Sequence, residues 1–243
     1  MPKREYLSPD AIYHVYNRGV DKRKIFLDDN DYLRGIHDLF EFNNEAPSTN
    51  LNYFLNSKSN RKQSIDSRNQ YIQKERKPRK LLVEILTFCF MPNHFHFLLK
   101  PLRIGGVELF MRKFGAGYAN YFNQKYERSG ALFQGRYKTI QISQESHFIH
   151  LPFYIHLNPL DLAFPEWRKR ELKNYQKAIQ FLESYRWSSY LDYIGKKNFP
   201  SVTQREFLLK FFEGPQNYKN QMEQWLKELS IENLENITLE SIY

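Results

Sequence analysis

The stretch MPNHFHFLL at residues 91–99 decides the fold that we expect for this chain. His94 and His96 alternate with Phe95 and Phe97, a pattern typical of a β-strand with one face in a core. Side chains two residues apart on a strand project from the same sheet face, so both imidazoles should point one way and both phenyl rings the other. Two parallel imidazoles form half of a metal site, although two hydrogen-bonded histidines in a half-buried sheet would show the same pattern.

The composition of the 243-residue chain limits its class and compartment. This length suits one large domain, or one domain with an appendage. No apolar run approaches the roughly 18 residues of a membrane-spanning helix, and the N-terminal residues lack the apolar segment of a secretory signal. The single cysteine, Cys89, cannot form an internal disulfide. We therefore expect a cytoplasmic protein.

Positive charge is unevenly distributed along the chain, whose formal net charge is +9. Residues 57–80 carry nine Lys or Arg against two acidic residues, and residues 100–140 carry eight against two. Residues 201–243 instead carry seven Glu against four Lys or Arg. Basic charge thus lies on both sides of the His-x-His stretch, which favours a polyanionic partner such as nucleic acid. For residues 57–80 alone, a solvated polar loop explains the charge equally well.

The order of the expected elements predicts an α+β, ferredoxin-like fold. Strands are expected at 11–18, 81–90, 94–99 and 135–142, and helices at 28–42, at 107–122 and from about 143. The order βαββαβ is that of the ferredoxin-like motif, an antiparallel sheet with helices on one face. We assign residues 1–160 to this domain, residues 43–80 to a mobile basic loop within it, and residues 161–243 to a mostly helical C-terminal extension.

A second informative stretch is HLPFYIHLNP at residues 150–159. Tyr154 and Asn158 are four residues apart, which places them on one face of a helix. Pro159 disfavours a helical conformation at Asn158, so the helix should end there with its amide turned outward. Pro152 should kink the helix or mark a fresh helix start.

These residues could complete a reactive centre with the paired histidines. An amide oxygen is a hard donor that suits Mg²⁺ or Mn²⁺, so Asn158 could join His94 and His96 as a third ligand. Three neutral ligands would leave the charge of the ion available to polarise a phosphate. Tyr154, one helical turn away, would then face that phosphate as a nucleophile and need help from the cation, because its reference pKa is about 10. The alternative is that Tyr154 only packs the helix against the sheet.

Several motifs, in order, resemble one known family. They are MPNHFHFLL at 91–99, GRYK at 135–138, YIHLNP at 154–159 and WSSY at 187–190, preceded by YHVYNRG at 13–19. Over roughly residues 8–195 the chain resembles the single-tyrosine HUH (His-hydrophobic-His) transposases of the insertion-sequence-200-like family. Within that family it resembles the REP-associated tyrosine transposase branch.

The resemblance implies a site and a reaction. His94, His96 and Asn158 match the family's ligands for a divalent metal ion, Mg or Mn, and Tyr154 matches its nucleophile. Such a tyrosine attacks single-stranded DNA, stays joined to the 5′-phosphate and leaves a 3′-OH. Family substrates are DNA hairpins, often from repetitive extragenic palindromes. The residues that we expect to contact DNA are Arg136, Lys138, Arg112, Lys113 and Arg18, with a solvent-facing role as the alternative for Arg112 and Lys113.

Other functions and assemblies stay open at this point. The chain could be a DNA-hairpin-binding protein of the same fold that has lost catalysis, or a metal-dependent hydrolase in which Tyr154 is only structural. In the extension, apolar stripes at 207–212 and 222–229 predict two amphipathic helices. They would pack on the domain or on a second copy of the chain, which would make a homodimer.

Overall fold

The computed structural model describes residues 7–46 and 79–228 of the chain. Four strands form one antiparallel sheet in the order β2-β3-β1-β4. The strands are β1 (Ile12–Arg18), β2 (Val83–Met91), β3 (His94–Pro101) and β4 (Lys138–Ile142). Most of the expected loop at 43–80 lies outside the described residues.

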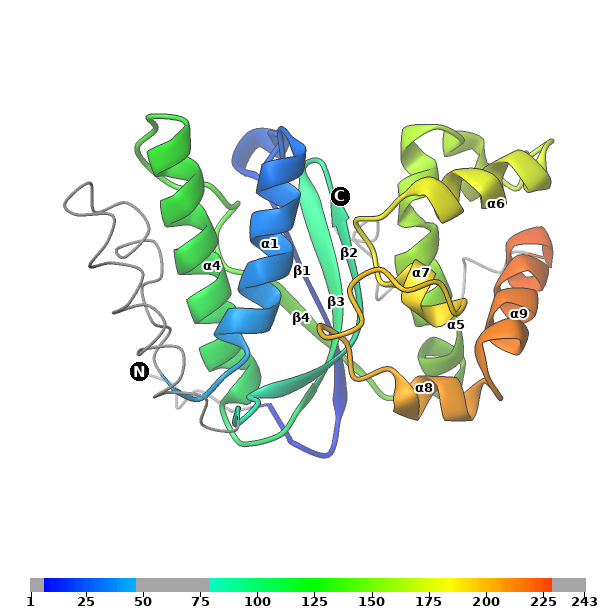
Figure 1. Ribbon diagram of the computed structural model, residues 1–243, viewed down its shortest axis with the longest axis horizontal. Coiled ribbons are helices and arrows are strands. Elements are labelled where there is room, and N and C mark those ends of the chain that lie inside the picture. Colours follow the sequence, from blue (N-terminus) through cyan, green and yellow to red (C-terminus); the bar gives the residue numbers. More distant parts are fainter. Residues whose placement is uncertain (1–6, 47–78, 229–243) are drawn as a thin grey trace, which may run out of the picture.

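Two helices cover one face of the sheet (Figure 1). They are α1 (Asp29–Phe42), which follows β1, and α4 (Gly106–Lys125), which follows β3. Asp28 caps α1 by accepting a hydrogen bond of 3.0 Å from the backbone N–H of Asp31. With β4 completing the order βαββαβ, the expected ferredoxin-like α+β fold is confirmed.

The core on this face is aromatic. Phe95 and Phe97 of β3 stack with their ring centroids 4.5 Å apart, and Phe114 of α4 packs edge-on against both. Burial of each such ring stabilises the fold by roughly 2 kcal/mol. Gly117 allows α4 to approach α1, because a Cβ at this position would lie 2.4 Å from the ring of Phe42. The alternation around the histidines therefore directs the phenyl rings into this core, as predicted.

The opposite face of the sheet is covered by the C-terminal half of the chain (Figure 1). Its helices are α5 (Glu145–Leu157), α6 (Tyr175–Ser184), α7 (Tyr190–Tyr193), α8 (Glu206–Phe211) and α9 (Pro215–Glu228). Short 3-10 helices occupy Val20–Lys22, Asn158–Leu162 and Pro165–Lys169. Leu86 and Leu98 of the sheet share one core with Leu151 of α5 and Trp225 of α9. The extension is helical as expected, whereas its boundary at residues 160 and 161 stays a prediction.

Two local expectations about α5 hold only in part. The helix continues through Pro152 instead of ending or restarting there. Every residue from Leu151 to Leu157 is buried, and this packing outweighs the backbone hydrogen bond that proline removes. α5 ends at Leu157 with Asn158 as its C-cap, as expected. Asn158 is nevertheless buried and adopts helical angles (φ −48°, ψ −39°) even though Pro159 follows, because the chain passes directly into a 3-10 helix with proline in its first turn.

The segment around the WSSY motif ties the extension to the edge of the sheet. The backbone N–H of Phe90 donates to the carbonyl of Trp187, and that of Ser189 donates to the carbonyl of Phe88. The Ser189 hydroxyl also contacts Nε2 of His156 at 2.7 Å, while Nδ1 of His156 contacts the Tyr218 hydroxyl at 2.6 Å. These contacts fix α5 against β2 and α9, and so hold the residues that α5 presents to the sheet.

No helix within the described ranges is long and apolar enough to cross a membrane.

Candidate active site

The two histidines of β3 project from the face of the sheet that α5 covers. In the register of the sheet, His94 pairs with Arg18 and His96 pairs with Tyr16 of β1. The two imidazole rings lie at right angles, with their centroids 5.0 Å apart. His96 is fully buried, and His94 is only partly exposed. The strand thus presents a pair of neighbouring imidazoles, as the alternation predicts.

Hydrogen bonds orient both rings through Nδ1. Nδ1–H of His94 donates to Oδ1 of Asn93 at 2.6 Å, because an amide oxygen can only accept. Nδ1 of His96 shares a hydrogen bond of 2.9 Å with Nε2 of His14. Both of these hydrogen bonds use Nδ1, and neither uses Nε2. Orientation of one ring nitrogen by an outer partner is the usual arrangement around metal-binding histidines.

Burial keeps the imidazole of His96 neutral. Its pKa lies well below the usual value, first because the ring is desolvated and then because His94, His14 and Arg168 place positive charge nearby. Nε2 of His96 is buried and has no hydrogen-bond partner among the described residues. A buried nitrogen lone pair without a partner carries a desolvation cost, which coordination of a cation would offset.

Asn158 lies beside this centre at the end of α5. Its Nδ2 donates to the carbonyl of Tyr154 at 2.8 Å, and its Oδ1 accepts a long contact of 3.4 Å from Nη2 of Arg168. The described residues contain no cluster of three or more His, Cys, Asp or Glu that could hold a metal ion. A metal ion held by the paired histidines would therefore need a third protein ligand of another type, and the amide oxygen of Asn158 could supply it.

The ring of Tyr154 lies next to His96. Tyr154 is fully buried, and its ring meets that of His96 edge-on with centroids 5.9 Å apart. The guanidinium of Arg168 lies 5.4 Å from the centroid of the Tyr154 ring. Arg168 is held in place by Asp161, whose carboxylate accepts from Nε and Nη2 at 2.7 Å each. A phenol, an imidazole pair, an amide and a guanidinium therefore gather at one place.

Sequence reasoning missed two members of this group. His14 is fully buried and stacks on His96 with centroids 5.1 Å apart, although the sequence reading gave it no role. The alternation of His14, Tyr16 and Arg18 could have revealed it, since alternate residues share a sheet face. Arg168 belongs to the extension, where the run WRKR at 167–170 was the available signal.

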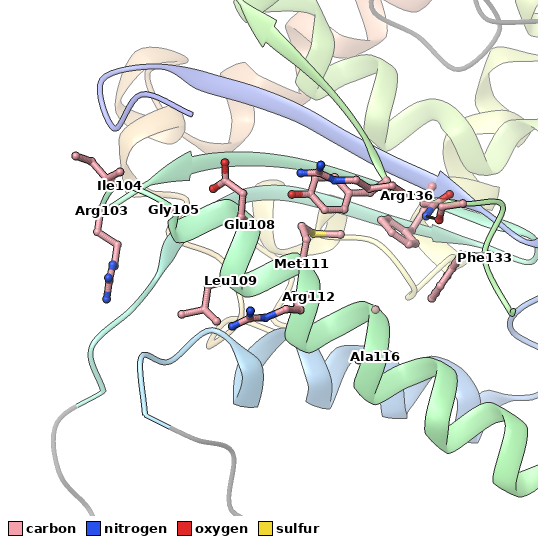
Figure 2. A pocket seen from close by; sticks show the side chains of 15 residues that line it. Arg103, Ile104, Gly105, Glu108, Leu109, Met111, Arg112, Ala116, Phe133 and Arg136 are labelled. Atoms are coloured by element: carbon pink, nitrogen blue, oxygen red, sulfur yellow. Dashed lines mark hydrogen bonds between the residues drawn. The ribbon is translucent and has the colours of Figure 1, made fainter. Parts of the chain in front are cut away.

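The residues expected to contact DNA divide between the two faces of the sheet. Lys138 pairs with Tyr16 and so lies on the histidine face, as does Arg18. Arg112 and Arg136 instead line a groove beside α4 on the other face (Figure 2). The ammonium of Lys113 donates to the carbonyls of Asn44 and Ala46 at 2.5 and 2.7 Å. Through these hydrogen bonds Lys113 holds the segment that follows α1.

One protein family matches part of the chain. Residues 54–158 match the family described as "Transposase IS200 like", and this stretch contains His94, His96, Tyr154 and Asn158.

The similarity of the chain to individual proteins is weaker. No curated protein matches the chain significantly. One similar solved structure is a REP-associated tyrosine transposase bound to a REP hairpin, at 13% identity and a TM-score of 0.43, covering 83% of this chain and 89% of that one. Another is a candidate transposase from Deinococcus radiodurans, at 13% identity and a TM-score of 0.30, covering 63% and 92%. Both scores are low, and neither likeness decides the function of this chain.

Proposed function

We propose that this protein is a transposase that nicks and rejoins single-stranded DNA through a covalent 5′-phosphotyrosine at Tyr154, acting on hairpin-forming repeats in the cytoplasm. The observation that carries the proposal is the contact between the Tyr154 ring and His96, whose buried Nε2 has no hydrogen-bond partner among the described residues. The family of the matched stretch supports a reaction on DNA. The REP hairpin held by the similar solved structure suggests the kind of substrate.

In this proposal His94, His96 and Asn158 would hold a divalent metal ion, Mg²⁺ or Mn²⁺. When bound, the ion would polarise the scissile phosphate. The guanidinium of Arg168 would add positive charge beside the Tyr154 ring, where phenolate and phosphate charge develops. Because Arg168 also contacts Asn158 and Asp161, it links the proposed metal ligand to the nucleophile.

The proposed reaction exchanges one phosphodiester for another. The phenolic oxygen of Tyr154 bonds to phosphorus and the bond from phosphorus to the 3′-oxygen breaks. The phenolic proton passes through solvent to the leaving 3′-oxygen, which is released as a 3′-OH. In the reverse direction a 3′-OH attacks the phosphotyrosine and the tyrosine leaves, so strands are rejoined without ATP. A homodimer in which the tyrosine serves its own subunit or the partner is compatible with this chemistry.

A second function is favoured by one observation. Tyr154 is fully buried and the amide of Asn158 is bonded to the carbonyl of Tyr154. A hairpin-binding protein that has lost catalysis would not need the hydroxyl of Tyr154 or the amide of Asn158 to be exposed. For catalysis, the 3-10 helix Pro165–Lys169, which carries Arg168, must move enough for DNA to reach the phenol.

The polarity of the covalent product tests the proposal. A hairpin with a single-stranded extension is labelled on either side of the expected nick and incubated with the protein and Mn²⁺, then denatured. We expect the label on the 5′-phosphate side to migrate with the protein, and the other fragment to carry a 3′-OH that a polymerase extends. A gel shift without any covalent product would support the hairpin-binding alternative. Free cleaved ends without an adduct would support a hydrolase.

His14 should act as a positioning residue for His96. Replacement of an outer partner of a metal-binding histidine typically lowers metal affinity about 10–100-fold. We therefore expect His14→Ala to weaken Mn²⁺ binding, measured by calorimetric titration, by at least about tenfold. His14→Gln should restore most of the affinity, because its amide oxygen can accept from Nδ1–H of His96.

His37 of α1 provides the matched control, since it lies on the other side of the sheet. His37→Gln should bind Mn²⁺ as the wild type does. Unchanged Mn²⁺ affinity in a folded His14→Ala variant would remove His14 from this role.

A further inference from the structure

His156 of α5 is a fully buried histidine to which the proposed reaction gives no role. It lies two residues after Tyr154, and residues two apart on a helix project from nearly opposite sides. The ring of Tyr154 meets that of His96, whereas the ring of His156 contacts the hydroxyls of Ser189 and Tyr218 in the extension. The imidazole of His156 therefore anchors α5 from the side opposite the proposed nucleophile.

The C-terminal half of α5 needs such an anchor because Pro152 interrupts the hydrogen bonds of the helix. Pro152 has no N–H and cannot donate to the carbonyl of Phe148, four residues earlier. A helix commonly kinks or breaks at such a position, yet α5 continues to Leu157. Contacts from outside the helix therefore hold the turn that carries Tyr154 in place.

The hydrogen bonds around His156 have one direction that uses every donor. Burial lowers the pKa of His156 to about 3, so the ring is neutral and carries one N–H. The Ser189 hydroxyl accepts from the backbone N–H of Phe88 at 3.0 Å and donates to the carbonyl of Phe88 at 3.2 Å. Nε2–H of His156 then donates to the Ser189 oxygen at 2.7 Å, and the Tyr218 hydroxyl donates to Nδ1 at 2.6 Å. The opposite direction would leave the Tyr218 hydroxyl proton without an acceptor among the described residues.

This network ties α5 to the strand that neighbours the paired histidines. Phe88 and Cys89 lie on β2, and Cys89 pairs with His96 in the register of the sheet. Ser189 is bonded to Phe88 through both its backbone N–H and its hydroxyl, so its position relative to β2 is fixed. The hydrogen bond from His156 to Ser189 therefore sets where α5 lies relative to His96.

We propose that His156 is a positioning residue for the reaction of Tyr154, because its hydrogen bond to Ser189 holds α5 where the phenol meets His96. This inference rests on the proposed function for the reaction itself. A displacement of about 1 Å between reacting groups can lower a rate about a hundredfold, so a hydrogen bond remote from the phosphate can control the rate. The WSSY motif at 187–190 thereby serves the reaction through α5.

Two substitutions of His156 and one of Ser189 test this role. A glutamine amide can place its N–H where Nε2–H lies, whereas an asparagine amide reaches only the position of Nδ1. At saturating hairpin and Mn²⁺, His156→Gln should form the covalent adduct within about threefold of the wild-type rate, and His156→Asn and Ser189→Ala about a hundredfold more slowly. The affinity of all three variants for the hairpin should stay within about threefold of the wild type, since none of them removes a basic side chain.

Tyr193→Phe is the matched control for stability. The Tyr193 hydroxyl is buried and donates to the carbonyl of Leu86 of β2 at 2.7 Å, so it ties α7 to the sheet as Ser189 does. Tyr193→Phe and Ser189→Ala should both lower the midpoint of thermal unfolding, but only Ser189→Ala should slow adduct formation. Wild-type adduct rates in folded His156→Asn and Ser189→Ala would overturn the proposal, as would equal slowing in Tyr193→Phe.

A second readout needs no reaction on DNA. In protein labelled with fluorotyrosine, the fluorine NMR signal of residue 154 is identified by its absence from Tyr154→Phe. This signal should shift in His156→Asn and Ser189→Ala, which displace the Tyr154 ring from that of His96, and should keep its wild-type position in His156→Gln. If the wild type forms no adduct, the proposed function fails and the fluorine signal alone decides the positioning role. An unmoved signal in both His156→Asn and Ser189→Ala would overturn that role.

Discussion

Tyr154→Phe should abolish the covalent protein–DNA adduct and lower strand joining at least about a thousandfold, as expected when the nucleophile of an enzyme is removed. The substitution deletes one oxygen and keeps the ring that packs edge-on against His96 and beneath Arg168. The fold should therefore be retained. The measurement is the fraction of labelled hairpin that stays with the protein after denaturation, with Mn²⁺ present.

The affinity for the hairpin distinguishes loss of the nucleophile from loss of the DNA-binding site. The affinity of Tyr154→Phe for the hairpin should stay within about threefold of the wild type, since the hydroxyl is buried and most DNA affinity comes from basic side chains. Tyr190→Phe, which alters another buried tyrosine hydroxyl on the same face, is the matched control and should form the adduct normally. An adduct that persists in Tyr154→Phe would place the nucleophile elsewhere and end the proposal for this residue.

The sheet and its first two helices could be predicted because their sequence signals are local. Alternation around His94 and His96 fixes which side chains of β3 share a face, and helical spacing of Phe110, Phe114 and Tyr118 fixes the buried side of α4. Both patterns depend only on the geometry of one element. The predicted strand and helix boundaries accordingly differ from the observed ones by a few residues.

Expectations that depended on tertiary contacts were less secure. Pro152 and Pro159 carry strong local preferences, yet α5 continues through Pro152 and Asn158 stays helical, because the buried surroundings of α5 outweigh both preferences. Arg168 could not be placed from the sequence, since its position beside Tyr154 depends on how the extension folds back over the sheet.

The site itself was only partly accessible to sequence reasoning. The spacing of Tyr154 and Asn158 predicts that they are neighbours, and the structure shows the hydrogen bond from Nδ2 of Asn158 to the carbonyl of Tyr154. The distance between α5 and β3 is a property of packing, which spacing does not encode. The division of the basic residues between two sheet faces, with Arg112 and Arg136 in the groove beside α4, likewise follows from the fold.

His96→Asn should lower the rate of metal-dependent cleavage at least about a thousandfold, because a bound ion contributes several kcal/mol of transition-state stabilisation. Asparagine places a polar atom where Nδ1 lies, which preserves the hydrogen bond with His14, but it lacks Nε2. The variant should therefore stay folded and should lose the rise in thermal midpoint that Mn²⁺ gives the wild type. His147→Gln, a partly exposed histidine on α5, is the control and should cleave within about threefold of the wild type. A folded His96→Asn variant that cleaves at the wild-type rate and still binds Mn²⁺ would show that the buried Nε2 is not a ligand, and the metal would then have to be held without β3.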